Sequence, residues 1–508
     1  MGNIVAINVC SLSRYAFAPL PGGSHAFGRA LAFAAGLPGA ERIYLLGAER
    51  LPEAERPETA RASDGSTVDV TGIDRPEWNL RELVGALVEI AGSGDLFYLF
   101  GDCPLYEQSL ARRMYENHVR YYAEYTFADA YPQGLSAEIL KGSLVRELPR
   151  LLAAGDSEVQ RDSLFTLIQR DINAFDIETI ISPVDLRLLR VQLSCDSRRN
   201  YDLTRRIIDA GALDEAAILE TVKRRGDLLR TLPAFAEVQI TDGITQTVSY
   251  SPYTKLLPDA PTRRNEMALS GFRRIVEQLS AYCEDATVSL SLWGEPALHS
   301  QLPALLSELY RHDGLTALIE TSGVGWREGV LEEIARSIGN RVTWIVDLDA
   351  ATPELYLKLR GEGWEEAHAT CERLLELFPG RVHVQAVRMA ANEADLEAFY
   401  LNWKARVPNV IIQKYDWFAG YLPQLKVTDL SPIRRLPCWH LKRDLVVLLD
   451  GTVPMCREDL AHEHPLGNLF EEELSAVWER GQALHVRHVA EDYPAICRAC
   501  DEYYTFNF

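Results

Sequence analysis

The stretch from Cys438 to Cys456 reads CWHLKRDLVVLLDGTVPMC. Its apolar run at 445–449 favours a buried strand, and Asp450-Gly451 favours a tight turn into a short return strand. We therefore expect a hairpin that carries Cys456 on its second arm. Further along, a separate segment contains a Cys-x-x-Cys pair, Cys497 and Cys500.

Two thiolates at Cys-x-x-Cys spacing can bind one metal centre, and the hairpin can bring two more to it. We expect four cysteines to converge as ligands: Cys438, Cys456, Cys497 and Cys500. Sulfur ligands suit either zinc or an iron–sulfur cluster, so ligand type alone leaves the metal open. The alternative is a chance Cys-x-x-Cys beside two unrelated buried cysteines.

Several short motifs lie between and beside these cysteines. In chain order they are Gly451-x4-Cys456, Gly467-Asn468-Leu469, Ser475-Ala476-Val477-Trp478 and Cys497-x2-Cys500. This order resembles the SPASM domain, the auxiliary cluster-binding module that follows many radical SAM barrels. The resemblance implies one [4Fe-4S] cluster on the four cysteines, with zinc as the alternative. The family pattern continues with further cysteines, but Phe506 stands where the next would fall, so the ligands suffice for one cluster.

Composition narrows the class of protein. The chain has 508 residues, 47% of them hydrophobic, and a net charge of −21, which disfavours binding to a phosphate backbone. Nine scattered cysteines argue against a secreted disulfide framework, so we expect a reducing cytoplasm. No apolar run reaches the length of a membrane span. The expected partner is therefore an unidentified protein or small molecule, with no nucleic acid and no membrane span.

The N-terminal region alternates apolar runs with helical patterns. Strands are expected at Asn3–Val9, Glu41–Gly47 and Asp95–Phe100, and helices at Ser24–Ala35 and Asn79–Ala91. This alternation predicts a mainly parallel sheet, which binds ligands at the carboxyl ends of its strands. Asp102 follows such a strand and could hold a divalent metal, or instead cap a helix that starts before Leu105.

Three N-terminal motifs add a resemblance. Gly101-Asp102-Cys103-Pro104-Leu105, Tyr131-Pro132-Gln133-Gly134-Leu135 with Glu138, and the segment 189–207 with Asp196 are similar to cytidylyltransferase-type sugar nucleotidyltransferases. The resemblance implies an α/β sandwich over 1–235, with Asp102 and Asp196 as its metal-binding aspartates. However, the loop 8–20 that would hold the triphosphate has no glycine and one cation, Arg14, and the first lysine is Lys141. We expect the fold without nucleotidyl transfer.

The middle region predicts repeated strand–helix units. The expected strands are Ala236–Thr241, Thr287–Trp293, Leu315–Thr321, Arg341–Asp349, Arg381–Met389 and Asn409–Lys414. The expected helices are Arg264–Ala281, Gln301–Tyr310, Arg327–Ser337, Glu365–Leu377 and Glu393–Ala405. Six such units predict a (βα)6 partial TIM-type barrel over 236–430, with its active face at the strand carboxyl ends.

This region resembles the radical SAM core. Gly294-Glu295-Pro296 is similar to the motif that holds the amino group of S-adenosylmethionine, and the segment 346–361 with Asp349 is similar to the fourth strand and helix. The resemblance implies an S-adenosylmethionine-like pocket at Gly294, Glu295, Pro296 and Asp349. Glu295 has an equal alternative as a barrel-rim carboxylate that caps nearby backbone.

The cluster-binding loop of a radical SAM enzyme is altered. The Cys-x-x-x-Cys-x-x-Cys motif would place cysteines near Ile244, Val248 and Ser251, and that motif does not occur in the chain. A neutral serine hydroxyl is a poor iron ligand. We therefore expect no reductive cleavage of S-adenosylmethionine, which is doubtful as a cofactor.

Together the sequence predicts an α/β protein of three domains, at 1–235, 236–430 and 431–508. The combination resembles the spirochaete SPASM-type family. The leading hypothesis is an iron–sulfur protein with a binding, electron-transfer or scaffold role, in which both radical SAM and nucleotidyltransferase activities are lost. One alternative is a sugar (CMP-type) nucleotidyltransferase of surface glycan synthesis that uses Asp102 and Asp196. The other is a barrel enzyme that binds S-adenosylmethionine without radical chemistry.

Overall fold

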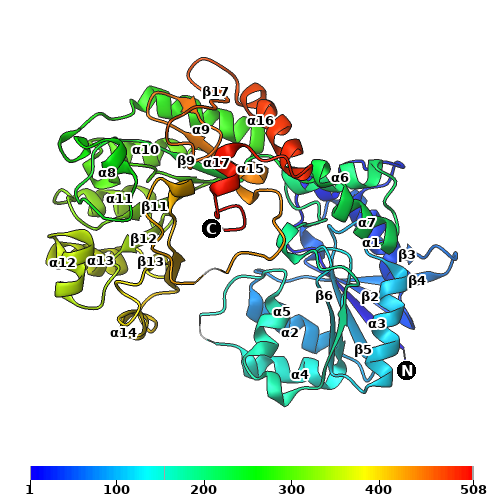
Figure 1. Cartoon of the computed structure of the whole chain (residues 1–508). Coiled ribbons are helices and arrows are strands. Elements are labelled where there is room, and N and C mark those ends of the chain that lie inside the picture. Colours follow the sequence, from blue (N-terminus) through cyan, green and yellow to red (C-terminus); the bar gives the residue numbers. More distant parts are fainter. Residues whose placement is uncertain (1, 154, 429, 506–508) are drawn as a thin grey trace. The chain divides into compact units, whose positions relative to one another are not determined.

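The computed structural model describes residues 2–153, 155–428 and 430–505 (Figure 1). Its chain forms two compact units that meet between Leu229 and Arg230, and each unit has a large sheet of its own. The α/β class with parallel strands, expected from the sequence, is confirmed.

The first unit is built on an eight-stranded sheet in the order β3-β4-β2-β1-β5-β7-β6-β8. The strands are β1 (Asn3–Asn8), β2 (Ala40–Leu46), β3 (Thr59–Arg61), β4 (Thr67–Ile73), β5 (Asp95–Phe100), β6 (Tyr125–Asp129), β7 (Glu138–Lys141) and β8 (Ile177–Ile181). The central strands β4, β2, β1 and β5 are parallel, whereas β3 and β7 pair antiparallel with their neighbours.

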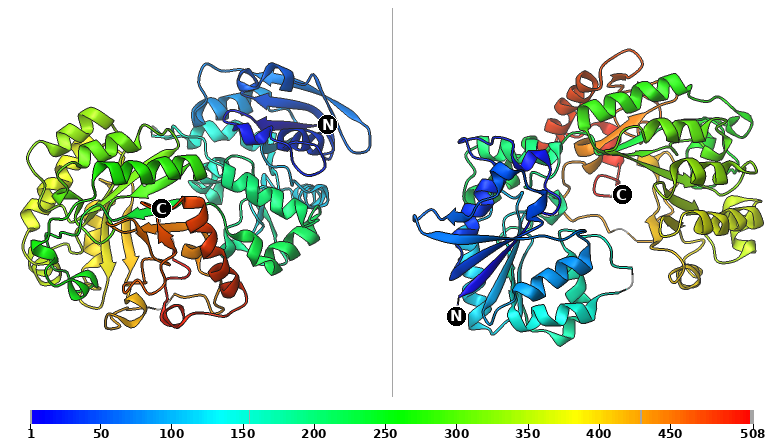
Figure 2. Two further views of the ribbon diagram at one scale, coloured as in Figure 1. Left: turned by 90° about the horizontal axis from the view of Figure 1, so that it is seen from above. Right: turned by 180° about the vertical axis from the view of Figure 1, so that it is seen from behind.

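Helices cover both faces of this sheet because its buried strands are apolar on both sides (Figures 1 and 2). In β1, Val5 and Ile7 face one core and Ala6 faces the other. One face packs against α1 (Ala26–Ala35), α3 (Gln108–Arg120), α6 (Arg198–Asp209) and α7 (Glu215–Arg224). The other packs against α2 (Leu80–Ile90), α4 (Gly142–Leu151) and α5 (Ser163–Gln169).

The second unit contains a seven-stranded sheet in the order β14-β13-β12-β11-β10-β9-β15, with every pair parallel. The strands are β9 (Phe235–Val238), β10 (Ala286–Ser289), β11 (Leu315–Thr321), β12 (Thr343–Asp347), β13 (Val382–Arg388), β14 (Val410–Lys414) and β15 (Asp444–Val447). The first six are the six strands expected from the sequence, in chain order.

The helices between these strands are α8 (Tyr253–Leu256), α9 (Leu269–Cys283), α10 (Leu302–Leu309), α11 (Val330–Ile338), α12 (Pro353–Arg360), α13 (Trp364–Leu377) and α14 (Leu396–Trp403). One sheet face supplies Ala236, Ile319 and Val384 to the large core that these helices cover. The alternate positions Glu237, Glu320 and Gln385 therefore point to the opposite face, which is polar. A polar inner face marks this side of the sheet as the place for a site.

The prediction that the two strands around Gly451 pair as a hairpin is wrong, although the turn between them forms. The turn forms, with the Gly451 amide donating to the Leu448 carbonyl at 2.9 Å. However, β15 pairs parallel with β9, and the return strand β16 (Thr452–Val453) pairs antiparallel with β17 (Gly467–Asn468). All four residues of β15 are buried, and a strand buried on both faces is accommodated at the edge of a parallel sheet.

Three helices complete the second unit: α15 (Trp439–Arg443), α16 (Leu474–Val489) and α17 (Ala495–Ala499). Trp478 of α16 lies in the same core as the sheet, and its indole N–H donates to the Thr231 carbonyl at 3.1 Å. The cysteine-bearing segment is therefore fastened to the sheet at two places, β15 and α16.

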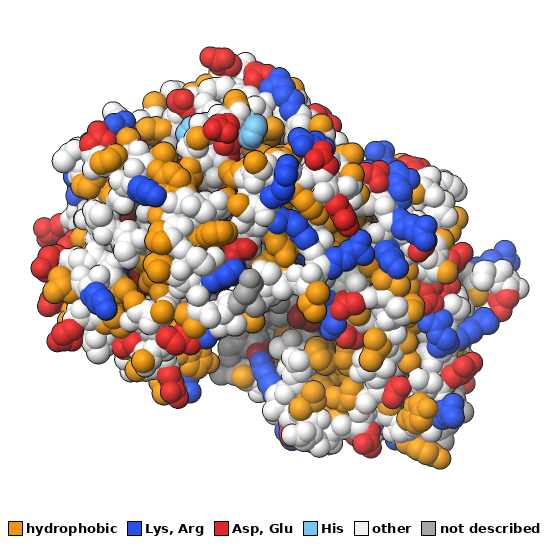
Figure 3. Space-filling view, in the orientation of Figure 1, with side chains coloured by type: hydrophobic (Ala, Val, Ile, Leu, Met, Phe, Trp, Pro, Cys, Tyr) orange, Lys and Arg blue, Asp and Glu red, His pale blue; other side chains and the backbone are white. Residues whose placement is uncertain are grey.

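The surface carries both signs of charge. On the face drawn in Figure 3, Lys and Arg side chains are interspersed with Asp and Glu. Across the described residues, no helix combines the length and apolar character needed to cross a membrane.

Candidate metal centre

The four predicted cysteines line a single buried pocket of the second unit. Cys438 directly precedes α15, Cys456 follows β16, Cys497 lies in α17, and Cys500 comes just after that helix. The pocket lies over the polar face of the sheet edge, where Glu237 of β9 and Asp444 of β15 also line it. Three separate segments thus bring together residues that are far apart in sequence.

Arg435 fixes the Cys-x-x-Cys segment. Its guanidinium donates to the Cys497 carbonyl at 2.6 Å and to the Cys500 carbonyl at 3.2 Å. The same group stacks on the rings of Tyr493 and Tyr503, at 4.6 and 4.3 Å from their centroids. These contacts orient the backbone so that both sulfurs can reach the pocket.

Burial controls the protonation state of the four pocket cysteines. Burial raises the pKa of Cys438 to about 12 and that of Cys497 to about 11, and it also raises the pKa of Cys456 and Cys500. Backbone N–H groups oppose this effect, as the Glu502 amide donates to the Cys500 sulfur at 3.3 Å. The free thiols are therefore protonated, and a metal would bind the thiolates with release of protons.

Some polar atoms in the pocket have no partner in the described part of the chain. They are Nε of Arg435, both ring nitrogens of His488 and one carboxyl oxygen of Glu458. His488 and Glu458 are 1% and 5% exposed. Buried polar atoms are normally hydrogen-bonded. The N–H groups of Arg435 and His488 can donate to a bound group with acceptor atoms, and a sulfide-containing cluster is such a group.

A second cavity lies beside the cysteine pocket. It has a volume of about 260 Å³ and lies at the carboxyl ends of the strands, where Glu320, Asp347 and Gln385 line it. Glu237 and Arg457 line both the cavity and the cysteine pocket. These two side chains therefore form the shared wall between the two sites.

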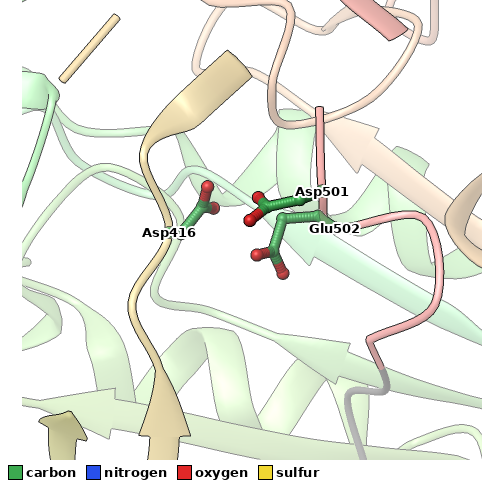
Figure 4. Close-up of side chains that lie close together, drawn as sticks. All are labelled: Asp416, Asp501 and Glu502. Carbon is green, nitrogen blue, oxygen red and sulfur yellow. The ribbon is translucent and has the colours of Figure 1, made fainter. Parts of the chain in front are cut away.

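Three carboxylates near that wall also come together: Asp416, Asp501 and Glu502 have ligand atoms within 4.8 Å of one another (Figure 4). Each is paired with a basic side chain. Lys414 contacts Asp501 and Glu502, Lys426 contacts Asp501 at 3.1 Å, and Arg457 contacts Asp416 at 3.2 Å. Arg457 also contacts Glu458 at 3.2 Å and Glu237 at 3.8 Å. The resulting network of ion pairs ties the segment after Cys500 to the end of β14.

Two of the residues expected for an S-adenosylmethionine-like pocket, Gly294 and Glu295, line the cavity. The Glu295 carboxylate accepts hydrogen bonds from the Thr321 hydroxyl at 2.6 Å, from the Ser322 amide at 2.9 Å and from the Ser322 hydroxyl at 2.6 Å. It also accepts from the Ala297 amide at 3.3 Å. Both oxygens of Glu295 are thus used within the protein, whereas Pro296 begins a buried turn beside it.

Asp349 is bound to side chains that sequence reasoning did not identify. Arg360 donates to Asp349 at 2.5 Å and to the Tyr250 hydroxyl at 2.6 Å, and that hydroxyl also contacts Asp349. The Tyr250 side chain is half-buried, and both Tyr250 and Arg360 line the cavity. A hydrogen-bonded triad of tyrosine, arginine and aspartate thus forms at the wall of the cavity.

In the first unit, the structure brings Asp102 and Asp196 together around Arg161. The guanidinium donates to Asp102 at 3.1 and 2.6 Å and to Asp196 at 3.0 Å. Burial alone would raise the pKa of Asp196, but Arg161 and the Asn200 amide hold it below its usual value. Asp102 does not cap a helix, because α3 begins with Glu107 as its N-cap. Arg161 thus supplies the positive charge that both aspartates face.

Comparisons with known proteins agree with the cysteine pocket. The family model of the SPASM domain, an iron–sulfur cluster-binding domain, matches residues 438–501. An uncharacterized protein of Treponema pallidum (strain Nichols) is 37% identical over 360 residues, which cover 68% of this chain and 98% of that protein.

Solved structures show weaker similarity. BtrN in complex with AdoMet and 2-DOIA is 17% identical over 53% of this chain and 93% of its own, with a TM-score of 0.36. Streptococcus suis SuiB bound to precursor peptide SuiA is 15% identical over 63% and 76%, with a TM-score of 0.40. Native anSMEcpe with bound AdoMet is 11% identical over 54% and 94%, with a TM-score of 0.41. Similarity at this level carries no information on activity.

Proposed function

Because this chain belongs to one family with the uncharacterized Treponema pallidum protein and carries a SPASM iron–sulfur cluster-binding domain, we propose that it is an iron–sulfur protein with an electron-transfer or scaffold role. In this proposal one [4Fe-4S] cluster is held by the four pocket cysteines: Cys438, Cys456, Cys497 and Cys500. The observation that carries it is the convergence of all four in a single buried pocket.

The family model that matches the cysteine segment favours a cluster over zinc, because it describes an iron–sulfur cluster-binding domain. Zinc would bind the same four thiolates in a tetrahedral site with Zn–S bonds near 2.3 Å. Analysis of iron, sulfide and zinc therefore separates the two metals.

Four protein ligands leave no iron open for a substrate, which favours an electron-carrying or structural cluster. Glu237 and Arg457 line both the cysteine pocket and the neighbouring cavity, which supports a cluster that acts on, or stabilises the site of, a ligand in that cavity. We propose that the strands of 236–430 form a (βα)6 partial barrel whose cavity is the ligand site, and that the module at 431–508 places the cluster next to it. A reducing cytoplasm suits such a cluster.

Neither enzymatic alternative is favoured by its site. A nucleotidyltransferase needs Asp102 and Asp196 free for a metal, but Arg161 already binds both. An S-adenosylmethionine site needs Glu295 free for an amino group, but Thr321, Ser322 and Ala297 occupy both of its oxygens.

Electron paramagnetic resonance of anaerobically purified protein tests the proposal. After reduction by dithionite, the wild-type chain should show one cluster signal, and that signal should vanish in each of four single Cys→Ala variants. Cys371, buried in the core of the second unit, is the matched control, since Cys371→Ala should keep the signal. A colourless protein with no signal in either redox state would overturn the proposal.

A further inference from the structure

His488, in the last turn of α16, is a buried side chain of the cysteine pocket. It is 1% exposed and lines the cysteine pocket, and neither ring nitrogen has a partner among the described residues. Leaving a buried donor or acceptor unpaired costs free energy, because the group loses its hydrogen bonds to water and gains none in the fold. The cost is avoided if a group bound in the pocket supplies the missing partner.

A second histidine in the same pocket provides a contrast. His440 also lines the pocket, but its Nδ1 lies 2.6 Å from the Asp444 carboxylate and its Nε2 lies 3.0 Å from the Glu502 carbonyl. Its ring is thus fully used in holding α15 to β15 and to the segment after Cys500. His488 differs because neither of its ring nitrogens has a hydrogen-bond partner in the described part of the chain.

The His488 ring is linked through Tyr493 to Arg435, the residue that binds the Cys-x-x-Cys backbone. It packs edge to face against Tyr493, with the ring centroids 4.9 Å apart and the planes at 88°. Tyr493 in turn stacks on Arg435, which binds the carbonyls of Cys497 and Cys500. The imidazole and the Cys-x-x-Cys segment are therefore fixed relative to one another through one stack.

We propose that His488 donates an N–H···S hydrogen bond to the cluster held by the four cysteines and thereby raises its reduction potential. This inference rests on the proposed function. An imidazole carries at least one N–H in either charge state. Reduction adds negative charge to the cluster sulfurs, and a donor aimed at them stabilises the reduced form more than the oxidised form. His488 therefore contacts the cluster as a hydrogen-bond donor and is not a ligand of its iron.

A redox titration of the full chain tests the proposal. The His488→Leu variant should keep the cluster but have a lower midpoint potential than wild type, because the donor is lost. His488→Gln, which retains an N–H donor, should recover part of the shift. His485→Leu is the matched control, since His485 is equally buried on α16 but does not line the pocket, and its potential should equal that of wild type. An unchanged potential in His488→Leu would overturn the inference.

Isotope labelling removes the dependence on the His488→Leu variant. In wild-type protein with ¹⁵N-histidine, pulsed electron paramagnetic resonance of the reduced cluster should show a weak nitrogen coupling that is absent in His488→Gln. A spectrum that is the same in both proteins would contradict the inference even if His488→Leu fails to assemble. A wild-type protein without iron and sulfide would instead refute the proposed function, so the two failures are distinguishable.

Discussion

The cysteine pocket of the second unit and the aspartate pair of the first unit both bring together residue types that can bind metals. They differ in whether the protein itself supplies hydrogen-bonding and charged partners for these residues. Asp102 and Asp196 are bound by Arg161, so that site is complete within the protein. The cysteine pocket leaves His488 and Glu458 with unpaired buried atoms. Ligand-type residues thus indicate a metal site only when the protein does not already supply their counter-charge.

Removal of a pocket cysteine should have the largest effect. Cys456→Ala should abolish iron and sulfide binding and destabilise the segment after β15, because metal binding supplies folding free energy to a module with a small core of its own. Metal analysis and limited proteolysis measure both effects. The matched Cys371→Ala variant should retain the cluster, and full iron content in Cys456→Ala would remove that cysteine from the ligand set.

Removal of the Arg161 guanidinium should have the next largest effect, a loss of stability in the first unit. Arg161→Met leaves the buried Asp102 and the half-buried Asp196 without their cation. Breaking a fully buried pair costs about 3–5 kcal/mol of unfolding free energy, and we expect a loss near the lower end of this range. Millimolar Mn²⁺ should restore part of this stability in the variant and none in wild type, as thermal melts can measure. Arg150→Met, at an exposed pair with Asp171, should change stability far less and show no Mn²⁺ effect.

Acid should narrow the difference between Arg161→Met and wild type. In wild type the pKa of Asp196 is lowered, so its interaction stabilises the fold above the unfolded pKa and is lost as pH falls through the folded pKa. In the variant, burial remains without the cation and the pKa of Asp196 rises. Urea unfolding at a series of pH values should therefore show the stability gap shrinking as pH falls from 7 to about 3. A gap that widens in acid would mean that Arg161 does not act through these carboxylates.

Removal of the Tyr250 hydroxyl should reduce the unfolding free energy by a smaller amount, because the rest of the triad stays paired. Tyr250→Phe removes a buried hydroxyl but leaves Arg360 and Asp349 paired, so we expect a loss of about 1–2 kcal/mol in unfolding free energy. Chemical denaturation measures it against Tyr400→Phe, an exposed tyrosine on α14. A loss no larger than in the control would show that the hydroxyl contributes nothing to the triad.

Local patterns predicted much of the fold. β5 and β11 have the expected bounds to the residue, because apolar runs between turn signals define strands without reference to distant partners. The partner of β15 was missed because β9 lies about two hundred positions earlier in the chain. A short strand after a Gly turn reads as a hairpin when only its neighbours are considered.

In the candidate sites, too, the residues with a local sequence signal were predicted and those that depend on distant partners were not. The four cysteines were predicted because their residue type and spacing are the signal. Arg161 was missed because nothing in its own segment marks it as the partner of Asp102 and Asp196. His488 was missed because the lack of a hydrogen-bond partner is a property of the packed fold, and no sequence pattern expresses it.

Analysis of iron, acid-labile sulfide and bound divalent metals in the anaerobically purified full chain tests the central contrast most directly. The account predicts about four iron and four sulfide per chain, all lost together in Cys456→Ala, with no stoichiometric manganese, magnesium or zinc, because Arg161 occupies the other site. Stoichiometric zinc without sulfide, or a divalent metal retained in Cys456→Ala and lost in Asp102→Asn, would contradict it.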